Sequence, residues 1–162
     1  MVDWALSQLG PGGKVGTHGE SLGAAISLHH AAIDPRISFA IADCSFSNLR
    51  ELFTTRIYAD YHLPAFPFVN IAGWLCSRQL GFSLEEASPI SSIMQVRSPV
   101  LFIHGQEDRY IPPSMSQDLY DNKLTGVRGL YLVPGAGHAD ALVKDRAEYD
   151  LQVGLFLDKL NI

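Results

Sequence analysis

The sequence predicts an α/β fold in which a parallel sheet of about four strands is flanked by helices. Four short segments are predicted to be strands, and the apolar run Ile37–Ala42 among them suits a strand that is buried on both faces. They are Lys14–His18, Ile37–Ala42, Val100–Ile103 and Leu130–Val133. Segments with helical spacing of apolar residues separate these strands, and no hairpin signal joins any two of them. Strands that alternate with helices are joined by right-handed crossovers, and such crossovers make the sheet parallel.

The length and composition favour one folded domain and argue against two classes of partner. The 162 residues suit a single domain, and a hydrophobic content of 47% suffices for its core. A net charge of −5 without a basic patch argues against nucleic-acid binding. No segment has the length and hydrophobicity of a membrane span, and no signal peptide opens the chain, so we expect a cytoplasmic location. Cys44 and Cys76 stand apart, without metal-ligand spacing, and are expected to be reduced, packed side chains.

A serine between two glycines follows the first strand. The stretch Gly19-Glu20-Ser21-Leu22-Gly23 lies where this strand meets a helical segment that continues to Ile33. A sharp strand-to-helix turn strains the serine backbone, and we expect a Cβ atom at either glycine to collide with that turn. The turn exposes the hydroxyl and directs the Leu22 N–H and the positive end of the helix dipole toward it. Ser21 is therefore the candidate nucleophile, and the Leu22 N–H is the candidate oxyanion donor.

Two further polar residues follow the last two strands. Asp108 comes after the third strand and His138 comes after the fourth. Because the carboxyl ends of parallel strands meet at one edge of the sheet, we expect both side chains near Ser21. Serine needs a base to take its proton, histidine is the usual base, and a carboxylate behind it orients the ring. Asp43, at the end of the second strand, is an alternative acid, and His104 is expected only to end its strand and shape a turn.

Three stretches carry a resemblance to a known fold family. They are Val15–Gly23 (VGTHGESLG), Pro99–Pro112 (PVLFIHGQEDRYIP) and Val133–His138 (VPGAGH). In this order the chain resembles the C-terminal part of an α/β-hydrolase-fold serine hydrolase, similar to bacterial esterases and prolyl-oligopeptidase-like members. The resemblance covers nearly the whole chain. It implies Ser21 as the nucleophile, Asp108 as the acid and His138 as the base, with no metal and no cofactor.

The chain also departs from this family. In such folds several strands precede the nucleophile, whereas here the elbow begins at Gly19. We therefore expect a partial α/β-hydrolase fold, without the loop that normally supplies a second oxyanion N–H. The outer edge of Lys14–His18 would be bare, and bare apolar edges pair with other chains. The sequence thus predicts a homodimer, or another association, through this sheet edge.

The segment 50–88 differs in character from the rest of the chain. It is rich in aromatic residues, and Pro64 and Pro67 interrupt it, so we expect two or three short helices. We interpret 50–88 as a helical insertion within the domain. Such an insertion either only packs on the body or caps the site and gives the substrate an apolar wall.

Two functions from different classes remain open at this point. The first is a serine hydrolase that cleaves carboxylic esters or related small-molecule acyl substrates, with an apolar acyl group favoured over a charged peptide. Peptidase or thioesterase activity would use the same machinery. The second is a non-catalytic half-domain or fragment with a vestigial triad. The intact serine, aspartate and histidine favour the first function, and the missing strands favour the second.

Overall fold

The computed structural model describes residues 1–162 and contains one four-stranded sheet. The strand order is β1-β2-β3-β4, and each neighbouring pair is parallel. The strands are β1 (Val15–Glu20), β2 (Ile37–Asp43), β3 (Val100–Gly105) and β4 (Arg128–Val133). The predicted fold class is confirmed, because every predicted strand is present and the helices lie between and around the strands.

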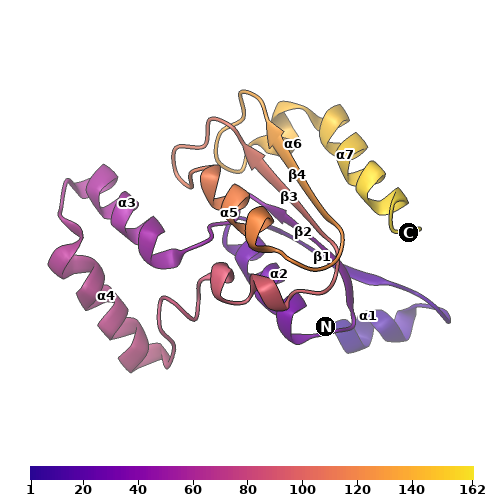
Figure 1. Cartoon of the computed structure of the whole chain (residues 1–162), viewed down its shortest axis with the longest axis horizontal. Coiled ribbons are helices and arrows are strands. Elements are labelled where there is room, and N and C mark those ends of the chain that lie inside the picture. Colours follow the sequence, from indigo (N-terminus) through magenta and orange to yellow (C-terminus); the bar gives the residue numbers. More distant parts are fainter.

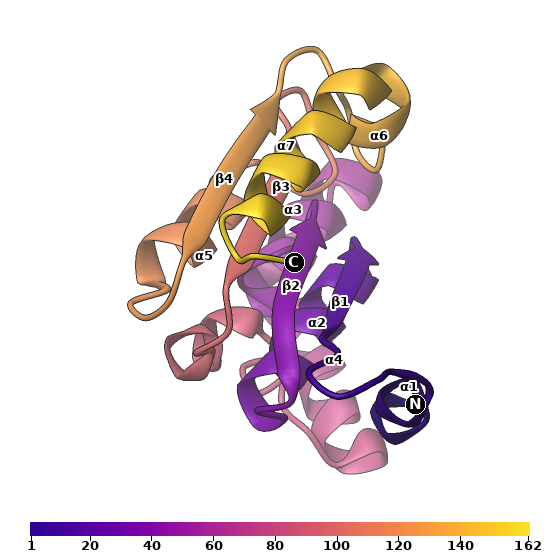
Figure 2. The ribbon, with the colours of Figure 1, turned by 90° about the vertical axis from the view of Figure 1, so that its right-hand side faces the viewer.

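Helices cover both faces of the sheet (Figure 1). On one face lie α2 (Leu22–Ile33), α5 (Ser114–Asn122) and the short 3-10 helices η1 (Pro89–Ser91) and η2 (Ile93–Gln95). On the other face lies α7 (Arg146–Asp158), which follows the single turn α6 (Ala141–Lys144). Helix α1 (Val2–Gln8) lies near the start of β1 (Figure 2). None of the helices combines the length and the apolar character that crossing a bilayer requires.

The two central strands explain why the core has two halves. Successive strand residues point to opposite faces, so each buried strand supplies both layers. Ala40, Val100 and Phe102 pack toward α2 and α5, in a cluster that also holds Leu28 and Leu119. The next residues along the same strands pack toward α7, together with residues of that helix: Ile41, Leu101, Ile103, Tyr149 and Phe156. This double burial accounts for the continuous apolar runs of β2 and β3.

Strand β1 lies at the edge of the sheet and pairs only with β2. Helix α2, which packs against both strands, buries Leu28 but exposes three larger apolar residues to solvent. They are Leu22, Ile26 and Ile33, with 61%, 59% and 81% of their surface exposed. The association through this edge that the sequence predicts is not decided by these observations and stays a prediction.

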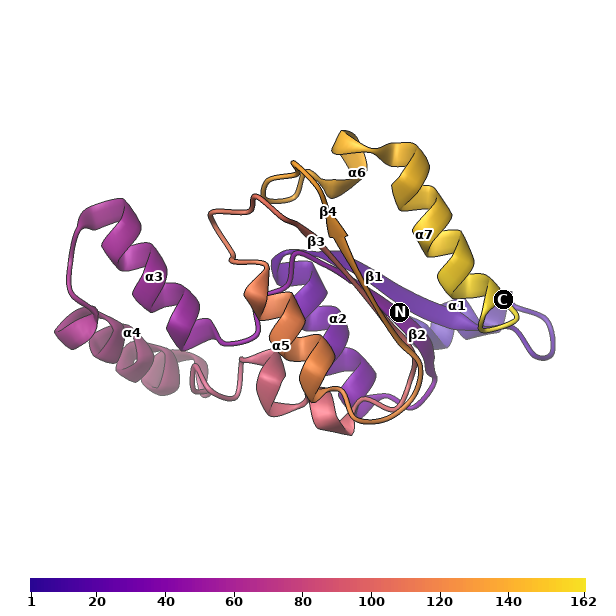
Figure 3. The same ribbon diagram turned by 45° about the horizontal axis from the view of Figure 1, so that its top comes forward.

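Helices α3 (Leu49–Tyr61) and α4 (Ala65–Leu80) form a pair that stands beside the sheet (Figures 1 and 3). The side chain of Asn48 caps α3 by accepting the Glu51 N–H at 3.1 Å. Leu52, on the second turn, is buried in a small cluster with Phe46 and Met115 and so fastens the pair to the body. The segment 50–88 therefore contains two α-helices, and only the base of α3 is anchored in a buried cluster.

Candidate active site

The turn after β1 holds Ser21 in an unusual backbone conformation. Its φ of 54° lies in the left-handed region, which costs a non-glycine residue on the order of 1–3 kcal/mol. The Ser21 N–H donates to the Asp43 carbonyl at 2.8 Å, and its own carbonyl accepts the Ala24 N–H at 3.1 Å, so the turn is held from both sides. A Cβ at position 19 would overlap the Gly23 backbone, as expected, but one at position 23 would meet open space. The predicted collision is right for Gly19 and wrong for Gly23.

Leu22 is the first residue of α2, directly after the serine. The first N–H groups of a helix have no intrahelical acceptor, so its N–H is free to bind another group. The positive end of the helix dipole adds to the attraction of negative charge at this point. The Leu22 N–H is therefore a suitable oxyanion donor, while its exposed side chain takes no part in the site.

The structure brings the three candidate residues Ser21, Asp108 and His138 together at the carboxyl ends of the strands. The hydroxyl oxygen of Ser21 lies 3.1 Å from His138 Nε2. The other ring nitrogen, Nδ1, lies 2.7 Å from Asp108 Oδ2. With Nδ1 protonated, the ring donates to the carboxylate, and Nε2 is free to accept the serine hydrogen. This arrangement can remove a proton from the hydroxyl and stabilise the resulting imidazolium.

The Asp108 carboxylate is buried, and donors surround both of its oxygens. Oδ1 accepts the N–H groups of Tyr110 and Ile111 at 2.8 and 2.9 Å. Oδ2 faces the rings of His138 and His104. Burial alone raises the pKa of Asp108, but the hydrogen bonds from the two rings and the two backbone N–H groups outweigh it and lower the pKa below its ordinary value. Asp108 is therefore held as the anion that an orienting acid needs to be.

His104 has a larger part in this network than its position in the sequence suggested. It does end β3, but its fully buried ring also lies against Asp108 Oδ2, with Nε2 at 3.2 Å. On its other side Nδ1 lies 2.6 Å from the hydroxyl of Ser116 on α5. The interpretation of His104 as a residue that only shapes a turn was too narrow. The spacing of His104 four residues before Asp108 was the available signal.

Asp43, the alternative acid, lies in different surroundings. Its side chain is 3% exposed, and one oxygen, Oδ1, has no hydrogen-bond partner. Burial raises its pKa to about 6, although a hydrogen bond from Tyr149 acts in the opposite direction. The Tyr149 hydroxyl also lies 2.9 Å from His18 Nε2. Asp43 therefore belongs to a cluster that faces α7, and no hydrogen bond joins it to His138.

A second set of contacts links α3 to the histidine. The ring of Tyr110 lies 4.9 Å from that of His138, centroid to centroid, at an angle of 43°. Over Tyr110 lies the guanidinium of Arg56, 4.4 Å from the ring centroid, and the same group pairs with Asp60. A cation over an aromatic face is attracted by the ring quadrupole. Helix α3 is thus joined to the candidate site by a stack of three side chains.

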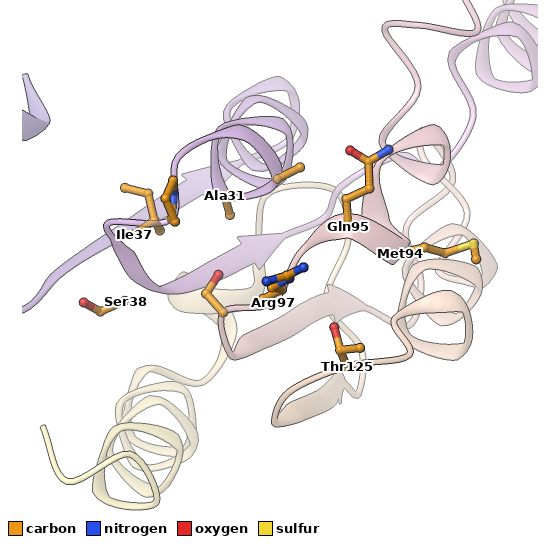
Figure 4. Close-up of a pocket in the computed structure, with 10 residues that line it drawn as sticks. Ala31, Ile37, Ser38, Met94, Gln95, Arg97 and Thr125 are labelled. Atoms are coloured by element: carbon orange, nitrogen blue, oxygen red, sulfur yellow. The ribbon is translucent and has the colours of Figure 1, made fainter.

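Two hollows of the molecule differ in character. An apolar groove of about 170 Å³ lies between α3 and α4, with Arg56 as its single charged residue. Its other lining residues are Phe53, Ile57, Tyr61, Phe68, Val69 and Ala72. A larger open cavity of about 910 Å³ lies at the amino ends of β2 and β3, with Ile37, Ser38 and Arg97 in its wall (Figure 4). The catalytic candidates are at the opposite ends of the strands from this cavity, and none of them lines the apolar groove, whose Arg56 lies over Tyr110 in the stack on His138.

Two histidines of α2 and the buried cysteine lie outside this arrangement. His29 Nδ1 lies 3.0 Å from the Ser92 hydroxyl, and His30 faces Asp34 on the surface. Cys44 is buried, and its burial raises the pKa of the thiol to about 12, which leaves it protonated and unreactive. No group of three or more His, Cys, Asp or Glu side chains is arranged to hold a metal ion.

The fold of the chain is hydrolase-like, as comparison with solved structures shows. An esterase from Pyrococcus furiosus, Pf2001, superimposes with a TM-score of 0.71 and 17% identity, over 98% of this chain and 58% of the esterase. The Pyrococcus horikoshii acylaminoacyl peptidase matches with a TM-score of 0.62 and 16% identity, over 91% of this chain and 24% of the peptidase. Acetyl xylan esterase 1 from Thermoanaerobacterium matches at 0.61 and 20%, over 90% of this chain and 45% of that enzyme.

Similarity in sequence is found with two bacterial proteins that are described as uncharacterised. YqkD of Bacillus subtilis is 38% identical over 151 residues, which are 92% of this chain and 49% of YqkD. Rv2307c of Mycobacterium tuberculosis is 30% identical over 132 residues, 82% of this chain and 40% of that protein. The chain thus spans half or less of the length of these relatives. No protein-family model matches it.

Proposed function

We propose that the chain is a serine hydrolase that cleaves carboxylic esters through an acyl-enzyme on Ser21. One observation carries the proposal, namely the two hydrogen-bond contacts that link Ser21 to His138 and His138 to the buried carboxylate of Asp108. The strained turn at Ser21 supports it, because such strain persists only where the surrounding structure maintains it and it clusters at functional sites. The esterase and peptidase neighbours support the hydrolase class by fold alone.

The proposed reaction follows from the hydrogen-bond directions. Ser21 attacks the acyl carbon while His138 Nε2 takes the hydroxyl proton. The Leu22 N–H stabilises the oxyanion of the tetrahedral intermediate, and collapse of that intermediate expels the alcohol, which takes the proton from His138. Water then attacks the acyl-enzyme by the same route and releases the acid.

The acyl group is proposed to be small or medium in size and apolar. The groove between α3 and α4 supports this, because six of its seven lining residues are hydrophobic and its one cation, Arg56, is already paired with Asp60. A charged peptide would find no free counter-charge in this groove. The stack of Arg56 and Tyr110 on His138 connects the groove with the proposed base.

The proposal is tested with a fluorophosphonate probe and with nitrophenyl esters of increasing acyl length. We expect the wild-type chain to be labelled at Ser21 and to prefer short or medium acyl chains over charged peptide amides. Ser21→Ala should abolish both labelling and turnover with an unchanged melting curve, because the residue adds no core volume. Equal turnover by the two proteins would overturn the nucleophile assignment. Absence of labelling in a folded wild-type chain would instead support the non-catalytic half-domain.

A further inference from the structure

Asp108 is held between two imidazole rings, and only one of them contacts the proposed nucleophile. Both rings approach the same carboxylate oxygen, Oδ2, His138 with Nδ1 at 2.7 Å and His104 with Nε2 at 3.2 Å. Behind His104, the Ser116 hydroxyl lies 2.6 Å from Nδ1. His104 and Ser116 are completely buried, so neither can touch a substrate. The contacts form one continuous chain from Ser116 to the nucleophile.

The surroundings of His104 determine which ring nitrogen carries the hydrogen. Nε2 faces two acceptors, Asp108 Oδ2 and the Ile111 carbonyl oxygen at 2.9 Å, so it has to be the donor. Nδ1 faces only the Ser116 hydroxyl, which can donate to it. A single neutral tautomer therefore satisfies both nitrogens of a ring that has no access to water.

We propose that His104 is a positioning residue for the acid of the triad. Its Nε2–H, fixed by the two acceptors that it faces, holds Asp108 Oδ2 in the orientation that receives Nδ1–H of His138. This inference rests on the proposed function, because it assigns a role in the same reaction. It extends the three-residue site to five residues, with the two added members on β3 and α5.

The physical effect of His104 on the reaction has two parts. The first is geometric: the backbone N–H groups of Tyr110 and Ile111 hold Oδ1, and His104 holds Oδ2, so the carboxylate has no freedom to rotate away from His138. The second part is electrostatic. If His104 no longer donates to Asp108, Oδ2 keeps His138 as its only ring donor, and more of the negative charge of the carboxylate faces His138. A ring that faces this charge retains its proton to higher pH, so the acid limb of the activity profile moves upward.

Other charged groups also face these rings, and the test leaves them unchanged. Asp43 on β2 acts electrostatically on both His104 and His138. Arg56 on α3 acts on His138 through the intervening ring of Tyr110. Substitutions at position 104 alter neither of them, so a displaced acid limb is attributable to the bond between residue 104 and Asp108.

The matched pair His104→Gln and His104→Asn separates positioning from packing. A glutamine amide reaches about as far as Nε2 and can still donate to Asp108, whereas an asparagine amide ends one methylene earlier, beside Ser116. We expect His104→Asn to lower kcat roughly 10- to 150-fold, the range of a hydrogen bond to a charged group. KM should remain within about twofold, because the binding contacts are untouched. The acid limb should move to higher pH, because Asp108 has lost one donor. We expect His104→Gln to keep kcat within about fivefold, with the acid limb in place.

The proposal is overturned if both variants retain the wild-type rate. It is also overturned if both lose activity equally with unmoved acid limbs, since packing alone would then explain the loss. Failure of the proposed function appears as an absence of ester cleavage and of probe labelling. The role of His104 is then tested separately by a low-field proton NMR resonance from the His138–Asp108 bond, which requires no turnover. In a chain that cleaves no ester, a resonance displaced in His104→Asn and kept in His104→Gln still supports the role of His104. An unchanged resonance in both overturns it.

A third variant covers the case in which His104→Asn does not fold, as judged by thermal melting. Ser116→Ala removes the hydroxyl that can donate to Nδ1 of the ring. The same resonance should then shift, because a ring whose Nδ1 no longer accepts a hydrogen bond is a weaker donor at Nε2. A resonance identical to that of the wild type in Ser116→Ala would contradict the proposal.

Discussion

Asp108 and Asp43 occupy the carboxyl ends of adjacent strands, and both side chains are almost completely buried. Their surroundings are nevertheless opposite. Asp108 accepts hydrogen bonds on both oxygens, whereas Asp43 leaves Oδ1 without a partner. Donors lower the pKa of the first, and burial raises the pKa of the second to about 6. Two like residues at like positions are thus distinguished by the loops and helices around them, and only Asp108 faces the histidine.

The largest expected effect is on activity. Asp108→Asn should lower kcat/KM for a nitrophenyl ester by roughly 10³- to 10⁴-fold, because the amide favours the wrong tautomer of the histidine. His138→Ala should cost at least as much, since members of a triad act as a unit. Asp43→Asn should change kcat/KM by no more than about twofold, because it makes no bond to His138. If Asp43→Asn lowers kcat/KM strongly and Asp108→Asn does not, the assignment of Asp108 as the acid is wrong.

The next largest effect is on stability, and we expect Asp43→Asn to be more stable than the wild type at pH 7. The unfolded carboxyl titrates near its ordinary pKa of 3.8 and the folded one near 6, so the folded state binds the proton more tightly. Stability therefore falls as pH rises from about 4 to 6, and the penalty stays constant above that range, at up to about 3 kcal/mol. Asp43→Asn should remove this penalty. Urea unfolding should show a gain at pH 7 that disappears near pH 4, and an equal gain at both pH values would contradict the assignment.

Asp108→Asn should change stability at pH 7 in the opposite direction. Its folded pKa is depressed, so it contributes stability above its ordinary unfolded pKa, and this contribution is lost as pH falls through the folded value. Asp108→Asn should destabilise the fold at pH 7 by about 1–3 kcal/mol, because buried donors lose their charged acceptor. The same urea titrations serve as the measurement. A stabilised Asp108→Asn at pH 7 would show that burial, and not hydrogen bonding, dominates at this site.

The smallest effect concerns the edge strand beside Asp43. Glu20 of β1 lies in register with Asp43, and the outer side of β1 has no partner strand. The predicted association through this edge should appear in light scattering as a dimer or larger species at tens of micromolar. Asp43→Asn should leave it unchanged, since the Asp43 side chain is buried and bonded to Tyr149 of α7. A monodisperse monomer with a cooperative melt would refute the association.

The sequence was sufficient for the layout of the fold. The central strands β2 and β3 could be recognised from their apolar runs, because a central parallel strand is buried on both faces and tolerates little else. The spacing around Gly19 located the strand-to-helix turn, since a Cβ at that position overlaps the backbone of Gly23. The spacing did not show that position 23 has open space, because this depends on what lies opposite the helix in three dimensions.

The sequence was sufficient for one part of the site, and the other part depended on the tertiary structure. The order of Ser21, Asp108 and His138 along the chain, each after a strand, was readable because parallel strands bring their carboxyl ends to one edge. The partners of each carboxylate were not readable, since they come from residues distant in sequence. Tyr149 reaches Asp43 from the last helix, and His138 reaches Asp108 from the last loop.

By itself the sequence determined the parallel sheet, the turn that presents the serine, and three polar residues at one edge. These depend on local patterns, namely apolar runs, glycine spacing and strand order. Only the tertiary structure decided which aspartate is an anion with four donors, and that His104 and Ser116 stand behind it. The reason is that the charge state of a buried group depends on donors and on exclusion of water, and both are supplied by segments that meet only when the chain folds.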